Sequence, residues 1–265
     1  MENDSTSTIS PSWPTRWPKG SFSAGPTGAL ILALVGLLVL LFIATIAVFA
    51  ANANGDLARI ALQQNRMAFL KAVFVPSTIV QVAFEAVAAF LIIATLPRIT
   101  HFSLRDIGFR ALSARDLFIA ILGFAVMVLV VDGGGNLVSA VSHGQHQELA
   151  VQLFESLRAN LRLVVVFAIF AVVIQPMAEE TIFRVFLFNL GLRYGRFWGG
   201  AIFSGILFGA AHADAYAFVP LALGGIVLCG VYYTSRNAFA SMITHGLFNL
   251  LSTALIYFAP KLAGS

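Results

Sequence analysis

Charged side chains are scarce in this chain of 265 residues, of which 11% are charged and 59% hydrophobic. Soluble globular domains are about a quarter charged, so this chain has too few polar side chains to cover a folded surface in water. Its mean hydropathy of +0.89 agrees with this conclusion. The surplus apolar residues must face lipid. The composition therefore excludes an ordinary soluble domain and predicts an integral membrane protein.

Cysteine is almost absent as well, since Cys229 is the only one in the sequence. A single cysteine excludes an internal disulfide and a thiolate metal cluster, and the apolar run around Cys229 favours helix packing over a nucleophilic role. Basic runs interleaved with aromatic residues are also missing, so the net charge of +4 does not indicate nucleic acid as a partner. We expect a lipid bilayer to surround the chain instead.

Long apolar runs are what the sequence does contain. A helix that crosses a membrane needs about 20 apolar residues, and seven runs come near this length. Their number could also be six or eight, because Asp132 with the three glycines that follow it, and Pro176, each leave a break ambiguous. We predict an all-α, polytopic transmembrane helix bundle with an active site inside it. The expected spans are 28–51 (uncleaved), 72–96 (ending before Pro97), 117–140, 161–190, 197–212, 216–233 and 238–258.

The composition along the chain divides it into four parts. Residues 1–26 are polar and rich in Ser, Thr and Pro, which is typical of a disordered tail. Residues 27–158 hold the N-terminal transmembrane helices and loops, 159–258 form a C-terminal membrane core, and 259–265 are a short tail. No internal repeat is visible, so one membrane domain is the simplest interpretation.

Basic residues between the spans predict the orientation in the membrane. A cytoplasmic N-terminus places three connections on the cytoplasmic side, where positive residues are preferred. The loop between the first two spans opposes this orientation. The supporting residues are Arg98, Arg105, Arg110, Arg115, Arg193, Arg196 and Arg236, and the opposing residues are Arg59, Arg66 and Lys71.

Three successive apolar segments carry ionisable or amide side chains. Each ionisable residue in a span costs about 2.5–3.5 kcal/mol on insertion scales, so a cluster of them indicates a function. Glu179, His212 and His245 follow one another at intervals of 33 residues, about the length of one helical hairpin. Three helices could thus bring them together. The segments contain Glu179, Glu180 and Arg184, then Phe208 and His212, then His245 and Asn249.

Helical spacing suggests a role for each of these side chains. Glu180 and Arg184 are four residues apart and can pair, which would neutralise both. Glu179 points about 100° away and has no local partner, so it is the better candidate for a general base. His245 and Asn249 share a face and can present two N–H donors to one oxyanion. Phe208 lies one turn from His212 and shapes the pocket.

These roles combine into a hydrolytic mechanism as a hypothesis. Glu179 and His212 would hold and deprotonate a water molecule that attacks a peptide carbonyl, and the other pair would stabilise the oxyanion. In a variant, Glu179, His212 and His245 bind Zn²⁺. The close spacing of the HExxH zinc motif is absent, so we favour a mechanism that requires no cofactor.

A structural role is the alternative for each residue taken alone. A single membrane histidine such as His212 is often only a hydrogen-bond partner between helices. Glu180 and Arg184 could form a buried brace, and we assign Glu85 and Asp132 to this structural class. Because the costly groups fall in successive spans, a functional polar site is the better interpretation of the set.

The motifs E-E-x-x-x-R, F-x-x-x-H and H-x-x-x-N, in this order in apolar helices, resemble the signature of the CPBP family of CAAX proteases and bacteriocin-processing enzymes, also called Abi. The similarity covers roughly 160–252, and 104–109 looks like a short motif that precedes the core in this family. The resemblance implies that Glu179 is the catalytic glutamate, His212 its partner, and His245 with Asn249 the oxyanion site. Glu180 and Arg184 fill the remaining positions of the first motif. The family is described both as metal-dependent and as using a glutamate without metal.

The leading hypothesis is an intramembrane endopeptidase of the bacterial cell membrane that cuts a membrane-associated peptide or protein, in CAAX-type or bacteriocin-type processing. The first alternative is a non-catalytic immunity or adaptor protein on the same scaffold. The second is a proton-coupled transporter in which Glu179 and His212 relay protons, although the sequence shows no inverted repeat.

Overall fold

A computed structural model describes residues 75–100, 103–142, 161–212, 214 and 216–258 of the chain. In these ranges the regular secondary structure is helical throughout, as the composition predicts. The predicted tails 1–26 and 259–265 and the predicted first span 28–51 lie outside the described residues. So do the three basic residues that oppose the expected orientation.

The helices fall into two groups along the chain, α4 and α5 before the gap at 143–160 and the rest after it. In the second group α7, η3, α8, η4 and α9 follow one another directly, with π-helical turns at η3 and η4. The bounds are α4 Val75–Thr100, α5 Ala114–Ser142, α7 Leu161–Ile169, η3 Phe170–Ile174, α8 Gln175–Glu180, η4 Thr181–Phe188, α9 Asn189–Ala211, α10 Phe218–Ser235 and α11 Ala238–Phe258.

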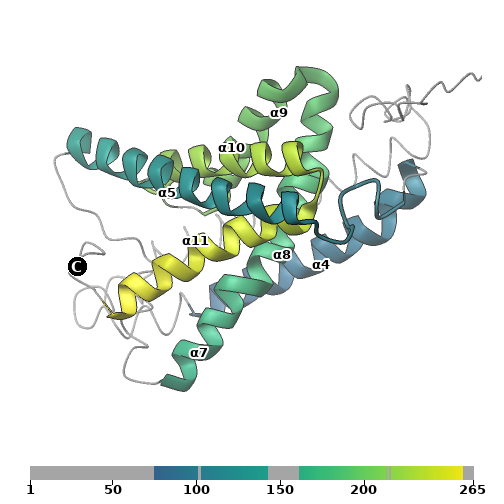
Figure 1. Cartoon of the computed structure of the whole chain (residues 1–265). Helices are drawn as coiled ribbons and strands as arrows, with labels where there is room; N and C mark the ends of the chain where they lie inside the picture. The colour runs from purple at the N-terminus through teal and green to yellow at the C-terminus, as the bar shows by residue number, and fades with distance from the viewer. Residues whose placement is uncertain (1–74, 101–102, 143–160, 213, 215, 259–265) are drawn as a thin grey trace, which may run out of the picture.

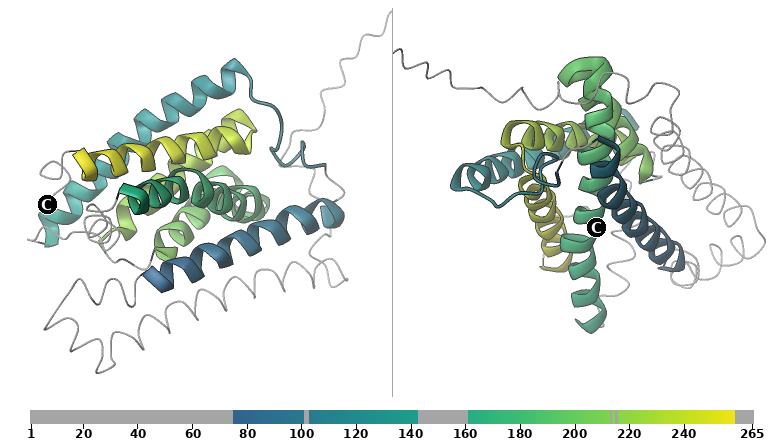
Figure 2. Two further views of the ribbon diagram at one scale, coloured as in Figure 1. Left: turned by 90° about the horizontal axis from the view of Figure 1, so that it is seen from below. Right: turned by 90° about the vertical axis from the view of Figure 1, so that its right-hand side faces the viewer.

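The helices lie side by side, and each packs against particular neighbours (Figure 1). α11 contacts α5 on one side and η3 and α8 on the other, and α8 and η4 in turn contact α4. The left view of Figure 2 shows this order as α5, α11, the rod from α7 to α8, and α4. α10 packs against both α5 and α9. The rod that carries the first sequence motif therefore lies between α4 and α11.

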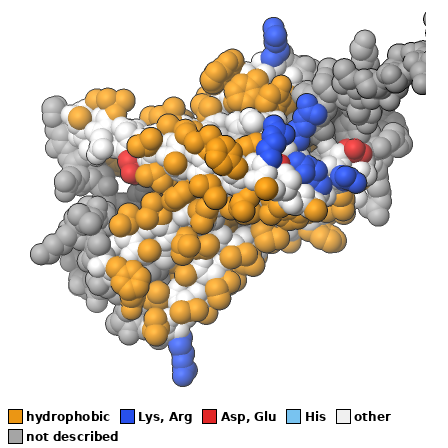
Figure 3. Space-filling model, in the orientation of Figure 1, with side chains coloured by type: hydrophobic (Ala, Val, Ile, Leu, Met, Phe, Trp, Pro, Cys, Tyr) orange, Lys and Arg blue, Asp and Glu red, His pale blue; other side chains and the backbone are white. Residues whose placement is uncertain are grey.

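Among the described residues, four helices are long and apolar enough to cross a membrane, namely 114–141, 164–192, 218–235 and 238–258, and a shorter apolar helix covers 81–97. Large apolar side chains such as Phe118, Leu129 and Phe258 are exposed on them, and hydrophobic atoms cover much of the face in Figure 3. The described part is thus that of an integral membrane protein. The predicted count of seven spans is not confirmed.

The predicted span 197–212 is the second part of α9, beyond a kink at Arg196, where φ is 54° and ψ is −161°. At about 1.5 Å per residue, the helical part after the kink is about 22 Å long, which is less than the roughly 30 Å of a hydrocarbon core. A residue at this φ and ψ interrupts the helix, so the chain changes direction at Arg196. The second part of α9 can then pack against the rest of the bundle.

Neither of the two ambiguous breaks interrupts its helix, since one continuous helix runs through Pro176 from residue 164 to residue 192. α5 continues through Gly133–Gly135, and a Cβ on Gly134 would lie 3.1 Å from Cα of Pro220. That glycine therefore serves close packing of α5 on α10, as small residues do in membrane helices. The apolar part of α4 ends at Pro97, next to the predicted end of that span, while the helix itself runs on to Thr100. A proline so near the C-terminal end removes only one hydrogen bond of the last turns.

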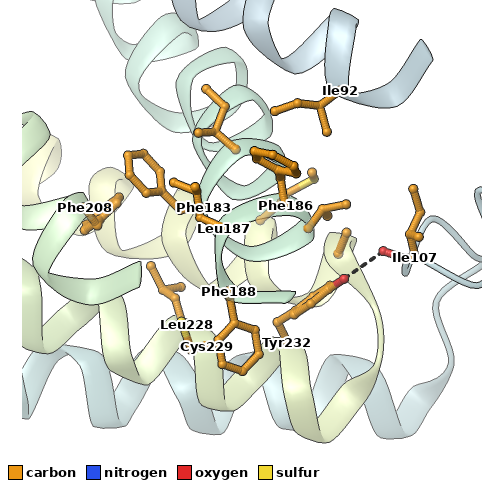
Figure 4. Packing of buried hydrophobic residues seen from close by; sticks show 14 of the residues in the cluster. Ile92, Ile107, Phe183, Phe186, Leu187, Phe188, Phe208, Leu228, Cys229 and Tyr232 are labelled. Atoms are coloured by element: carbon orange, nitrogen blue, oxygen red, sulfur yellow. Dashed lines mark hydrogen bonds between the residues drawn. The ribbon is translucent and has the colours of Figure 1, made fainter. Parts of the chain in front are cut away.

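A buried cluster of aliphatic and aromatic residues, most of them on η4, α9 and α10, forms the core (Figure 4), and Cys229 lies fully buried within it. The hydroxyl of Tyr232 donates to the carbonyl oxygen of Ile107 at 2.8 Å, and the amide of Ala238 donates to the carbonyl oxygen of Gly108 at 2.8 Å. Through these two hydrogen bonds, the short motif 104–109 links the α4–α5 connection to the α10–α11 turn.

Two of the three basic connections lie at the same end of the bundle. Arg110 pairs with Asp116 at 2.8 Å and donates to the carbonyl oxygen of Ser235 at 2.8 Å, while Arg115 donates to that of Thr234. Phe197, next to the kink, contacts Tyr233 nearby, so the third connection adjoins them. Figure 3 shows most of the described basic side chains gathered at this end.

Candidate active site

Glu180 and Arg184 form a fully buried ion pair, with Oε1 and Nη1 3.0 Å apart. The hydroxyl of Ser241 donates to Oε2 of Glu180, and Arg184 also donates to the carbonyl oxygen of Gly225 at 3.3 Å. Its guanidinium lies 4.4 Å from the centre of the Phe208 ring. The pair therefore ties η4 to α9, α10 and α11 and gives the site a rigid base.

Glu179 is also buried, with 2% of its surface exposed, but it lacks a cation of this kind. Gln175, one turn earlier on α8, donates to its Oε1 at 2.8 Å. Its Oε2 has no hydrogen-bond partner among the described residues. One oxygen of Glu179 is thus held in place, and the other is open to accept a proton.

His245 lies between the two carboxylates. Its Nδ1 is 3.0 Å from Oε1 of Glu180, and its Nε2 is 3.6 Å from Oε2 of Glu179. Because the oxygen that pairs with Arg184 acts as an acceptor, Nδ1 carries the hydrogen. Glu180 therefore fixes the orientation of the His245 ring and directs Nε2 toward Glu179.

His212 lies at the C-terminal end of α9 and is half-buried. Its Nδ1 is 2.8 Å from the carbonyl oxygen of Phe208, and since a carbonyl can only accept, Nδ1 is the donor. The other nitrogen, Nε2, is then an acceptor in the neutral ring. The Phe208 ring contacts both imidazoles, with centroids 4.9 Å from His212 and 5.6 Å from His245.

Asn249 donates from Nδ2 to the carbonyl oxygen of Ala171 at 2.7 Å. In η3 the backbone hydrogen bonds run from residue i to i−5, as from Gln175 to Phe170. The next donor in this pattern would be Pro176, which has no N–H. Asn249 supplies the missing donor to Ala171, and this accounts for its position. The second hydrogen of its amide remains for another acceptor.

Gly246, between His245 and Asn249, lets α11 approach η3, since a Cβ there would lie 2.5 Å from the carbonyl oxygen of Val172. We expect Gly246→Ala to destabilise the fold by about 1–3 kcal/mol, because backbone must move to relieve the overlap. Gly230→Ala is the matched control, because a Cβ there meets no atom within 4 Å. Unfolding in detergent measures both, and equal melting temperatures of the two variants would contradict the expectation.

Within the described residues, no group of three His, Cys, Asp or Glu side chains is arranged to hold a metal ion. Protein zinc sites use three or four such ligands. Glu179 and His245 are adjacent, but the described contacts of His212 are with Phe208. The predicted set for zinc, Glu179, His212 and His245, thus does not form a three-ligand site in this arrangement.

Glu85, which we assigned to a structural role from the sequence, lies next to the candidate site. It is buried on α4, which packs against α8 and η4, and its carboxyl interacts electrostatically with Glu179. Asp132, assigned to the same class, is exposed on α5. One available signal was the repeated spacing, since Gln81 precedes Glu85 by four residues just as Gln175 precedes Glu179.

Residues 161–251 match the family model described as type II CAAX prenyl endopeptidase Rce1-like. The C-terminal membrane core is thus similar to Rce1-like CAAX endopeptidases over about a third of the chain. This match confirms the resemblance to the CPBP family and includes all seven motif residues from Glu179 to Asn249. No curated protein and no solved structure matches the chain. Outside the Rce1-like segment lie α4 and α5, and with them Glu85.

Proposed function

We propose that this chain is an intramembrane endopeptidase in which Glu179 activates the water that hydrolyses a peptide bond of a membrane-associated peptide or protein. The observation that carries the proposal is the open Oε2 of Glu179, buried among apolar helices beside His245. A carboxyl oxygen in this position costs stability unless it meets a partner. A reacting water molecule is such a partner, and the Rce1-like match supports the reaction class.

The charges of the buried cluster support separate roles for Glu179 and His245. Glu180 and Arg184 neutralise each other, so these two residues together with Glu179 and His245 carry no net charge when Glu179 and His245 share one proton. Net charge in an apolar interior is costly, which favours the state in which Glu179 and His245 hold one proton between them. With the proton on His245, Glu179 is a carboxylate that can act as a base, and Nε2–H of His245 is a donor for an oxyanion.

The reaction follows from these roles. A water molecule donates one hydrogen to Oε2 of Glu179 and the other to Nε2 of His212, and its oxygen attacks the carbonyl carbon while its proton passes to Glu179. Nε2–H of His245 and the second amide hydrogen of Asn249 stabilise the oxyanion. When the C–N bond breaks, Glu179 returns the proton to the leaving amine, so a carboxyl group and an amine are formed.

The shared position of the basic connections supports an orientation. The end of the bundle with Arg110, Arg115 and Arg236 faces the cytoplasm in this proposal, as the positive-inside tendency requires, and the N-terminus lies on the same side. A bacterial cell membrane remains our proposed location.

Purified protein in liposomes, incubated with a library of amphipathic peptides, tests the proposed function. We expect cleavage products by mass spectrometry, with about 10²–10⁴-fold less product from His212→Ala, the range typical of a proton-transferring residue. Cleavage should persist in a strong chelator. Loss of cleavage in the chelator that added zinc restores would replace the metal-free mechanism. A biological phenotype that survives both Glu179→Gln and His212→Ala would favour the adaptor role.

A further inference from the structure

Glu85 lies on the face of α4 that packs against α8 and η4. The buried positions of this helix are Glu85, Ala88, Ala89, Ile92 and Leu96, whose spacing of three or four residues defines one face. This helix contacts α8 and η4, the elements that carry Glu179 and Arg184. The burial of Glu85 therefore results from contact with the active site and not from contact with lipid.

Glu85 and Glu179 are held in the same way on two neighbouring helices. Gln81 donates to Oε1 of Glu85 at 3.0 Å, as Gln175 does to Oε1 of Glu179 at 2.8 Å. In both residues Oε2 is buried and has no hydrogen-bond partner within the described part of the chain. Two carboxyl groups that interact electrostatically thus each keep one open oxygen.

We propose that Glu85 is a positioning residue of the active site, and that its open Oε2 holds the open Oε2 of Glu179 in place through one hydrogen-bond donor between them. This inference rests on the proposed function, in which Glu179 is the base. Two oxygens that only accept cannot bond to each other, so a hydrogen atom or a water molecule must join them. A carboxyl group keeps an accepting oxygen in either protonation state, so the bridge does not require one particular state.

The proposal extends the active site beyond the Rce1-like segment, because α4 precedes residue 161. The groups near the bridge are Glu179 on α8, Glu180 and Arg184 next to it, and His245 on α11. Among the described residues no lysine, arginine or histidine is paired with Glu85, so Glu179 is the ionisable group with which it interacts.

Cleavage kinetics of Glu85→Gln and Glu85→Asp in liposomes test the proposal. The amide of Gln would place a permanent N–H donor where the carboxyl has an accepting oxygen, and its hydrogen bond to Oε2 of Glu179 would weaken that oxygen as a base. We therefore expect kcat to fall about tenfold or more while KM stays within about twofold. Asp keeps the carboxyl and should recover part of kcat. Asp132→Asn, the same change on the exposed face of α5, is the matched control and should leave both constants unchanged.

The outcomes separate this proposal from the proposed function. If Glu179→Gln abolishes cleavage but Glu85→Gln and Glu85→Asp retain the wild-type kcat, the positioning role is overturned and the peptidase stands. If Glu85→Gln does not fold, the kinetics of Glu85→Asp decide alone. A wild-type kcat in that variant then overturns the positioning role. Should no peptide be cleaved, the melting temperatures of Glu85→Gln, Glu179→Gln and the double variant decide. Non-additive shifts support the bridge, and additive shifts reject it.

Discussion

Replacement of Glu179 by Gln should abolish peptide cleavage while the protein still folds. The amide has nearly the same shape as the carboxyl and can still accept the hydrogen bond from Gln175. It cannot take a proton from water, and loss of the proton-transferring group removes about 10²–10⁴-fold of rate. We therefore expect kcat below detection in the liposome assay, with substrate binding retained.

The neighbouring carboxyl provides the comparison that makes this prediction specific. Glu180→Gln also removes a charge, but it breaks the fully buried ion pair with Arg184, so the protein should lose stability as well as activity. Glu179→Gln should lose activity alone, since no cation of this kind pairs with Glu179. Wild-type turnover in Glu179→Gln would show that another residue is the base.

Local geometry along single helices was predictable from the sequence. The pairing of Glu180 with Arg184 follows from their spacing, and α11 has the bounds 238–258 that the apolar run indicates. The spacing also placed His245 and Asn249 on one face, and both meet the rod from η3 to α8. These features depend on one helix period, which a sequence displays directly.

Relations between helices were not predictable in the same way. The sequence places Glu179, His212 and His245 at successive intervals of 33 residues, which makes His212 the nearer histidine along the chain. The imidazole that lies against Glu179 is nevertheless that of His245. The difference arises from the rotation of each helix about its axis, which the π-helical turns η3 and η4 and the kink at Arg196 change. The same limit applies to Glu85, because only the packing of α4 on α8 shows that this residue lies near Glu179.

Arg184→Met should produce the largest loss of stability among single substitutions at the site. Met fills a similar volume, but the carboxylate of Glu180 would remain buried without its cation. Removing one partner of a buried pair typically costs about 3–5 kcal/mol, because the remaining charge is left uncompensated. Unfolding of the full chain in detergent should show this loss, whereas Arg115→Met, at an exposed position, should show little change.

The double variant Glu180→Gln/Arg184→Met distinguishes the charge from the other contacts of the arginine. If the isolated charge causes the loss, the double variant should be more stable than Arg184→Met alone, because replacing both ions removes the uncompensated carboxylate. If the loss comes from the guanidinium contacts with Phe208 and Gly225, the double variant should be no more stable than the single one. In that case Arg184 would act mainly as a packing element between η4, α9 and α10. Glu180 would then be held mainly by its hydrogen bonds with His245 and Ser241. Its main contribution would be to orient the His245 ring toward Glu179.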